Sequence, residues 1–176
     1  MFIWVACDID KAFTPVRKYC QEQNKTVRLS EVAFTLPQHI SLKISFLVPD
    51  TMVKSVVKDI ADYLAKQKPF CVYNPKTEYV ENILWITFDE CSVLQRLHDE
   101  LDTLLQYKHN VTPHLLDKRF IFHSTLFMDK NVKYTQTNFT DIPLPDSVQI
   151  NGFFIGISPS GDVGSYRVIK TVKVLS

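Results

Sequence analysis

The stretch His39-Ile40-Ser41-Leu42 recurs later in the chain as His123-Ser124-Thr125-Leu126. Both consist of a histidine, any residue, a hydroxyl side chain and an apolar residue, and each lies in a run typical of a β-strand, 38–48 and 120–128. Side chains alternate between the two faces of a strand, so each histidine shares a face with the hydroxyl two residues later. The apolar residue that ends each motif then points to the opposite face, where we expect the core.

Two imidazole and hydroxyl pairs on sheet surfaces are suited to acid–base chemistry on a phosphate. Cleavage of a phosphodiester needs one group to take a proton from the attacking hydroxyl or water, and another to protonate the departing oxygen. Histidine, with an ordinary pKa near 6.5, performs either role near neutral pH, and positioned proton transfer contributes about 100- to 10,000-fold in rate. We therefore predict that His39 and His123 are catalytic. Ser41 and Thr125 are predicted to donate hydrogen bonds to the non-bridging phosphate oxygens.

The double motif, separated by about half of the chain, resembles the two-histidine (2H) phosphoesterase superfamily, which includes 2'-5' RNA ligase-like proteins and cyclic phosphodiesterases. The resemblance covers essentially the whole chain, from a first strand at 2–8 to a last strand at 166–174. One position departs from the bacterial ligase branch. Many ligase-like members carry an arginine three residues after the second hydroxyl, where this chain has Met128.

The resemblance implies an α+β fold of two pseudo-symmetric lobes. Each lobe would contribute a largely antiparallel sheet with helices on its outer face, and the motif strands would line a central cleft. The sequence alternates strands and helices without an evident linker, so we expect a single domain, residues 1–176. Helices are expected at about 14–24, 51–64 and 90–106, and strands at 2–8, 38–48, 70–73, 83–88, 120–128, 148–158 and 166–174.

The activity that this resemblance implies is a metal-independent phosphodiesterase, without a cofactor, that acts on 2',3'-cyclic or 2'-5' linked nucleotides or on RNA ends. Reverse ligation would be a side activity of the same two histidines. The other interpretation is a nucleotide- or RNA-binding module that keeps the cleft with little or no turnover. Two titrating side chains favour the enzyme, because a binding module has no need of them. Base and linkage selectivity would depend on the loops at 25–37 and 129–146.

Two further residues share the faces of the motifs. Lys43, two residues after Ser41, is a candidate phosphate ligand, and a solvated lysine at a strand end is an equal alternative. Phe127, two residues after Thr125, is a candidate for stacking on a base, with core packing as the equal alternative.

Other conspicuous side chains are expected to lie outside the site. Arg119 is four residues before His123 and would be at most a contact at the rim. Trp4 and Trp85 lie in apolar strand runs, so we expect both in the core rather than beside a ligand.

The remaining histidines do not predict a metal site. His98 lies in the third helix, and His109 and His114 are in a loop at a spacing that is poor for metal ligands, so we expect solvated or capping roles. Each motif supplies one histidine and a neutral hydroxyl, which is a poor zinc ligand. No metal is therefore expected.

Composition restricts the partners. The net charge is only +1, with 22% charged residues, which argues against extended electrostatic binding to a long duplex. A small nucleotide or an RNA end is the favoured ligand. No window of about 18 apolar residues indicates a membrane span, and the first residues lack the basic start of a signal peptide. The widely spaced cysteines are typical of reduced, buried thiols. We therefore expect a cytoplasmic monomer.

Overall fold

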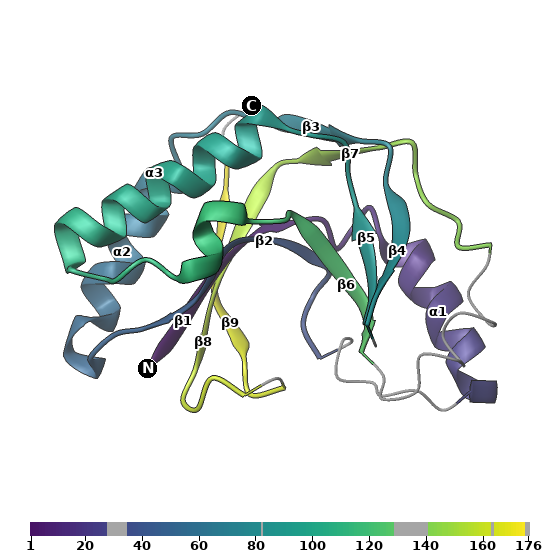
Figure 1. The fold of residues 1–176 in the computed structure, drawn as a ribbon, viewed down its shortest axis with the longest axis horizontal. Helices are drawn as coiled ribbons and strands as arrows, with labels where there is room; N and C mark the ends of the chain where they lie inside the picture. Colours follow the sequence, from purple (N-terminus) through teal and green to yellow (C-terminus); the bar gives the residue numbers. More distant parts are fainter. Residues whose placement is uncertain (28–34, 82, 129–140, 163, 175–176) are drawn as a thin grey trace.

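Antiparallel sheets and α-helices make up the computed structural model, which describes all residues except 28–34, 82, 129–140, 163 and 175–176 (Figure 1). The largest sheet has four antiparallel strands in the order β2-β1-β8-β9, with bounds β2 His39–Leu47, β1 Phe2–Asp8, β8 Gly152–Ser158 and β9 Arg167–Lys173. The first motif strand, β2, therefore lies at one edge of this sheet. The combination of antiparallel sheets and helices is an α+β fold, as the family resemblance implied.

The second motif strand belongs to a separate three-stranded antiparallel sheet. Its order is β4-β5-β6, with bounds β4 Lys76–Val80, β5 Ile83–Thr87 and β6 His123–Met128. The motif strand β6 is again at an edge, and it is in contact with β2. The two motifs thus meet where the edges of two different sheets approach each other.

Two predicted strand assignments were wrong. The single strand expected at 148–158 is broken at Asn151 into β7 (Ser147–Ile150), which pairs with β3 (Phe70–Tyr73), and β8, which joins the large sheet. Strand β4 was missed, because its first three residues are polar and exposed at a sheet edge and carry no alternating apolar pattern. The predicted loop at 129–146 falls mostly outside the described residues, and the one at 25–37 falls partly outside them.

The α-helices lie beside the four-stranded and the three-stranded sheets (Figure 1). Helix α3 (Ser92–His109) packs against β2, and α2 (Val53–Leu64) packs against β8, through buried residues at helical spacing: Val56, Ile60, Leu64, Leu94, Leu97, Leu101 and Leu105. Helix α1 (Thr14–Val27) lies beside β4 and β5 instead (Figure 1). In the described part of the chain, none of the helices combines the length and apolar character needed to cross a membrane.

One main core joins the four-stranded and the three-stranded sheets. Its fully buried side chains come from the motif strands and from their neighbours β1 and β5: Ile3, Val5, Ile40, Leu42, Leu84, Ile86 and Leu126. The chain also crosses between the sheets, because α3 follows β5 of the small sheet but packs against β2 of the large one. The shared core therefore holds the motif strands against each other. The pseudo-symmetry of two lobes stays a prediction.

Candidate active site

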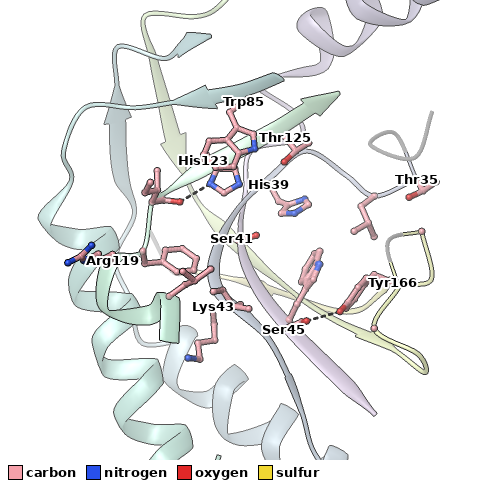
Figure 2. Close-up of a pocket in the computed structure, with 18 residues that line it drawn as sticks. Thr35, His39, Ser41, Lys43, Ser45, Trp85, Arg119, His123, Thr125 and Tyr166 are labelled. Atoms are coloured by element: carbon pink, nitrogen blue, oxygen red, sulfur yellow. Dashed lines mark hydrogen bonds between the residues drawn. The ribbon is translucent and has the colours of Figure 1, made fainter. Parts of the chain in front are cut away.

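A cavity of about 570 Å³ receives side chains from both motifs. His39 and Ser41 enter it from β2, and His123 and Thr125 enter it from β6. Figure 2 shows the two imidazoles over the same opening, with the hydroxyls beside them. The structure therefore brings together the four residues that the alternation of strand faces had selected.

Each imidazole is oriented by the same kind of hydrogen bond. His39 Nδ1 lies 2.8 Å from the carbonyl oxygen of Pro37, and His123 Nδ1 lies 2.7 Å from that of Ile121. A carbonyl oxygen only accepts, so Nδ1 carries the proton in both rings. Among the described residues neither Nε2 atom has a hydrogen-bond partner. Both Nε2 atoms are consequently available for proton transfer with a ligand.

Each imidazole also packs on a tryptophan from the neighbouring strand. The ring centroids of His123 and Trp85 are 3.8 Å apart with an interplanar angle of 19°, and those of His39 and Trp4 are 4.8 Å apart at 37°. Trp4 is buried, as expected of a core residue, but both tryptophans also line the cavity, which the sequence analysis did not expect. Their position on β1 and β5, the strands paired with the motif strands, was the signal that sequence reasoning missed.

The surroundings favour the neutral form of both histidines. Burial lowers the pKa of His39, the hydrogen bond to Pro37 partly opposes this, and the charges of His123 and Arg17 lower it further, with Asp10 acting in the opposite direction. Burial also lowers the pKa of His123, again partly opposed by its carbonyl bond. Because the charge on His123 acts on His39, the pair disfavours double protonation. Both shifts favour neutral imidazoles, so the singly protonated pair that acid–base catalysis requires forms at lower pH than it would with two ordinary histidines.

Comparisons with known proteins rest on structure. No protein-family model matches the sequence, and a search of curated proteins finds no relative. E. coli LigT complexed with 3'-AMP matches with 16% identity and a TM-score of 0.60, over 99% of this chain and 98% of that chain. TT0787 of Thermus thermophilus matches with 17% identity and a TM-score of 0.63, over 98% and 97%. Kluyveromyces marxianus Usb1 matches with 12% identity and a TM-score of 0.51, over 98% and 97%.

These proteins are members of the 2H phosphoesterase superfamily. The chain has the 2H phosphoesterase fold. The likeness, at these low identities, establishes the arrangement of the backbone over the whole chain, and the two motifs had predicted it.

In this 2H fold the motif hydroxyls remain free. Within the described ranges, neither Ser41 Oγ nor Thr125 Oγ has a hydrogen-bond partner, and both residues line the cavity. An anion between the two imidazoles would therefore meet two hydroxyl donors without having to break an existing bond.

Lys43 also lines the cavity, but its ammonium group is bound by carboxylates, whereas its candidate role as a phosphate ligand would need that group to face the ligand space. Its side chain is 1% exposed, and its ammonium group donates to Asp102 Oδ1 at 2.7 Å and to Asp117 Oδ2. The cause is an irregular register between β2 and β1, which leaves both Leu42 and Lys43 buried. The alternation of faces therefore ends just after Ser41, and the positive charge is neutralised by carboxylates.

Phe127 is fully buried and does not line the cavity, so core packing is its role in the structure. The register of β6 against β5 shifts between Leu84 and Trp85, so Thr125 is paired with Trp85 but Phe127 with Leu84. The bulge turns both Leu126 and Phe127 inward. Stacking of Phe127 on a base would require it to leave the core.

Aromatic and aliphatic side chains form the walls around the 2H motifs. They include Leu36 and Tyr166, and the hydroxyl of Tyr166 donates to Ser45 Oγ at 2.7 Å. Phe120, Ile121 and Leu116 also line the cavity, together with Arg119, the residue expected at the rim. Tyr166 was not predicted, because it comes from the loop between β8 and β9, where Gly161 and Gly164 adopt positive φ.

The other histidines serve the scaffold. His114 Nδ1 accepts a hydrogen bond from Leu116 N at the start of a 3₁₀ helix, which is the capping role expected for it. His98 is buried, and its ring nitrogens lie 2.7 Å from Leu42 O and 3.2 Å from Asp117 O, so a solvated role was wrong. Among the residues that the structure describes, no three histidine, cysteine or carboxylate side chains are grouped so that they could hold a metal ion.

Proposed function

We propose that this protein is a metal-independent phosphodiesterase in which His39 and His123 form the acid–base pair. The observation that carries the proposal is the shared orientation of the two rings. Each Nδ1 is held by the carbonyl two residues earlier, and both side chains line one cavity. A binding module would not need two imidazoles that each keep Nε2 free.

The reaction on a 2',3'-cyclic phosphate balances with these groups alone. The neutral imidazole takes a proton from water as the water oxygen bonds to phosphorus. The bond from phosphorus to one ribose oxygen breaks, and the protonated imidazole delivers its proton to that oxygen. Ser41 and Thr125 donate hydrogen bonds to the non-bridging oxygens, where negative charge increases. The products are a phosphomonoester and a free hydroxyl, and the same steps in reverse order join them.

The cavity favours a small substrate, namely a nucleotide or the end of an RNA chain. Its apolar lining, which includes Trp4 and Tyr166, suits a flat base, and a base stacked on an aromatic ring gains about 1–3 kcal/mol. Among the described residues, Arg119 lines the cavity without an ion pair to a carboxylate, whereas the charge of Lys43 is neutralised by two carboxylates. Structures of the neighbour LigT contain 3'-AMP, ATP and NADP+, which makes adenine nucleotides sensible first probes.

The test is a substrate screen followed by variants. Purified protein is incubated with 2',3'-cyclic AMP, a 2'-5' linked adenosine dinucleotide and the 3'-5' linked dinucleotide, and products are separated by chromatography. We expect turnover of at least one of the first two, which His39→Ala and His123→Ala each abolish. Tight nucleotide binding in calorimetry without any turnover would instead identify a binding module.

A further inference from the structure

Gln38, the residue just before the first motif, reaches across to the second motif strand. Its side-chain Nε2 donates to Ser124 Oγ at 2.5 Å and to the carbonyl oxygen of Thr125 at 2.9 Å. The carbonyl only accepts, so the nitrogen of the amide must face it. The side chain is almost fully buried, with 3% of its surface exposed. This amide therefore ties the edge of one sheet to the edge of the other.

The backbone of Gln38 is fixed on its own side as well. Its N–H donates to Asp10 Oδ1 at 2.7 Å, and its carbonyl accepts from Ile9 N at 3.2 Å. Asp10 is itself paired with Arg17 of α1. The amide thus projects from an anchored backbone rather than from a free loop, which makes it a rigid connection.

The two ends of this connection are adjacent to the two imidazoles. Gln38 is bonded covalently to His39, and its acceptors Ser124 and Thr125 directly follow His123. Ser124 is 1% exposed, so water does not compete for its hydroxyl. A change in the separation of the strands would move His39 relative to His123.

We propose that Gln38 is a positioning residue whose amide holds β2 and β6 at the separation that lets both imidazoles act on one phosphate. This inference rests on the proposed function, since it concerns the geometry of the same two histidines. A misplacement of about 1 Å costs on the order of 100-fold in rate. An amide suits the task because it donates two hydrogen bonds, whereas a carboxylate would face the carbonyl of Thr125 with a lone pair.

The kinetic test compares four variants. Gln38→Met keeps the length of the side chain without its hydrogen-bond donors. Gln38→Glu places a carboxylate against the carbonyl oxygen of Thr125, which repels it. Ser124→Ala removes one of the two hydrogen-bond acceptors. We expect kcat to fall about 10- to 100-fold in both Gln38 variants and by less in Ser124→Ala, with KM within about threefold. Gln106→Met, an exposed position on α3, is the matched control and keeps the wild-type kcat. Thermal melts verify that each variant is folded.

A second readout needs no substrate and follows the distance between the imidazoles. NMR titration gives the pKa of His39 with and without the substitution His123→Gln, in the wild-type and Gln38→Met backgrounds. Because the charge of His123 lowers the pKa of His39, His123→Gln raises it. We expect a smaller rise in the Gln38→Met background, where the strands are no longer tied. A purely structural contribution to stability would leave this difference unchanged.

The outcomes separate the two proposals. A folded Gln38→Met protein with wild-type kcat, or with an unchanged electrostatic interaction between the histidines, overturns the positioning role. If wild-type protein turns over no phosphodiester, the proposed function fails, and the NMR titration still decides whether Gln38 sets the geometry. If Gln38→Met does not fold, the same two measurements on Ser124→Ala decide, with unchanged kcat and pKa values counting against the inference.

Discussion

His123 stacks on Trp85, with ring centroids 3.8 Å apart and an interplanar angle of 19°. The carbonyl of Ile121 holds Nδ1 of the same ring, so one contact sets the plane of the imidazole and the other sets its rotation within that plane. A ring fixed in both ways presents Nε2 in a single direction. Trp4 and the carbonyl of Pro37 act on His39 in a comparable manner.

Removal of the stacking partner should loosen this orientation. We expect Trp85→Ala to lower kcat by roughly tenfold, because the imidazole regains rotational freedom. Trp85→Phe should retain most of the activity, since aromatic pairs are worth about 0.5–1.5 kcal/mol and the phenyl ring preserves one. Steady-state kinetics of the two variants checks this expectation. Equal activity in Trp85→Ala and wild type would show that the stacking does not orient His123.

Truncation of the motif histidines should lower kcat more than truncation of the motif hydroxyl side chains. His39→Ala and His123→Ala should each reduce kcat by about 100-fold or more, because each removes a proton-transfer group. Ser41→Ala and Thr125→Val should cost about 10- to 100-fold, because one donor to the developing charge is lost. Ser147→Ala, at an exposed position on β7, is the control for the hydroxyl variants. Wild-type turnover in either histidine variant would contradict the acid–base assignment.

The rate should depend on pH in a bell-shaped manner, with an acidic optimum. One imidazole must be neutral and the other protonated, so activity peaks between the two pKa values of the pair. Burial lowers the pKa of both histidines below the ordinary value. The maximum of kcat/KM should therefore lie below about pH 6.5. A profile that is flat from pH 5 to pH 9, in roughly the range where histidine titrates, would argue against this pair.

Lys43 should matter for stability rather than for substrate binding. Its side chain and that of Asp117 are 1% and 4% exposed, so Lys43→Met leaves a buried carboxylate without its partner. We expect a loss of about 3–5 kcal/mol in the free energy of unfolding, measured with urea. The double variant Lys43→Met/Asp117→Asn should recover much of that loss, because the deeply buried charge of Asp117 is removed and the unpaired Asp102 is 25% exposed. A large rise in KM with unchanged stability would instead make Lys43 a phosphate ligand.

Chelation should leave the activity intact. Each motif contributes one histidine and a neutral hydroxyl, whereas a catalytic zinc usually has three protein ligands drawn from histidine, cysteine and carboxylates. We expect the same kcat before and after dialysis against EDTA, with the metal content followed by mass spectrometry. Loss of activity that one divalent ion restores would refute the two-histidine mechanism.

The resemblance carried by the two motifs implied the α+β fold and the gathering of the motif residues in one cavity, whereas local periodicity predicted the strands that carry them. Alternation along a strand is sufficient to place His39 and Ser41 on one face, and the recurrence of the pattern indicated a second strand of the same kind. The exposed strand β4 could not be anticipated, since a polar edge strand forms only because β5 offers hydrogen bonds. The break at Asn151 could not be anticipated either. The apolar run 148–158 is divided between two sheets, because β7 pairs with β3 and β8 pairs with β1.

The sequence by itself determined that His39 shares a strand face with Ser41 and His123 with Thr125, since strand alternation is a property of the backbone at each residue and needs no partner. Only the tertiary structure decided that the ammonium group of Lys43 pairs with carboxylates and that Phe127 is buried, because the neighbouring bulges arise from strand pairing with β1 and β5. Gln38 likewise acquires its role from strand β6, far away in the sequence. Contacts across sheets depend on how two edges meet, and that is set by the shared core as a whole.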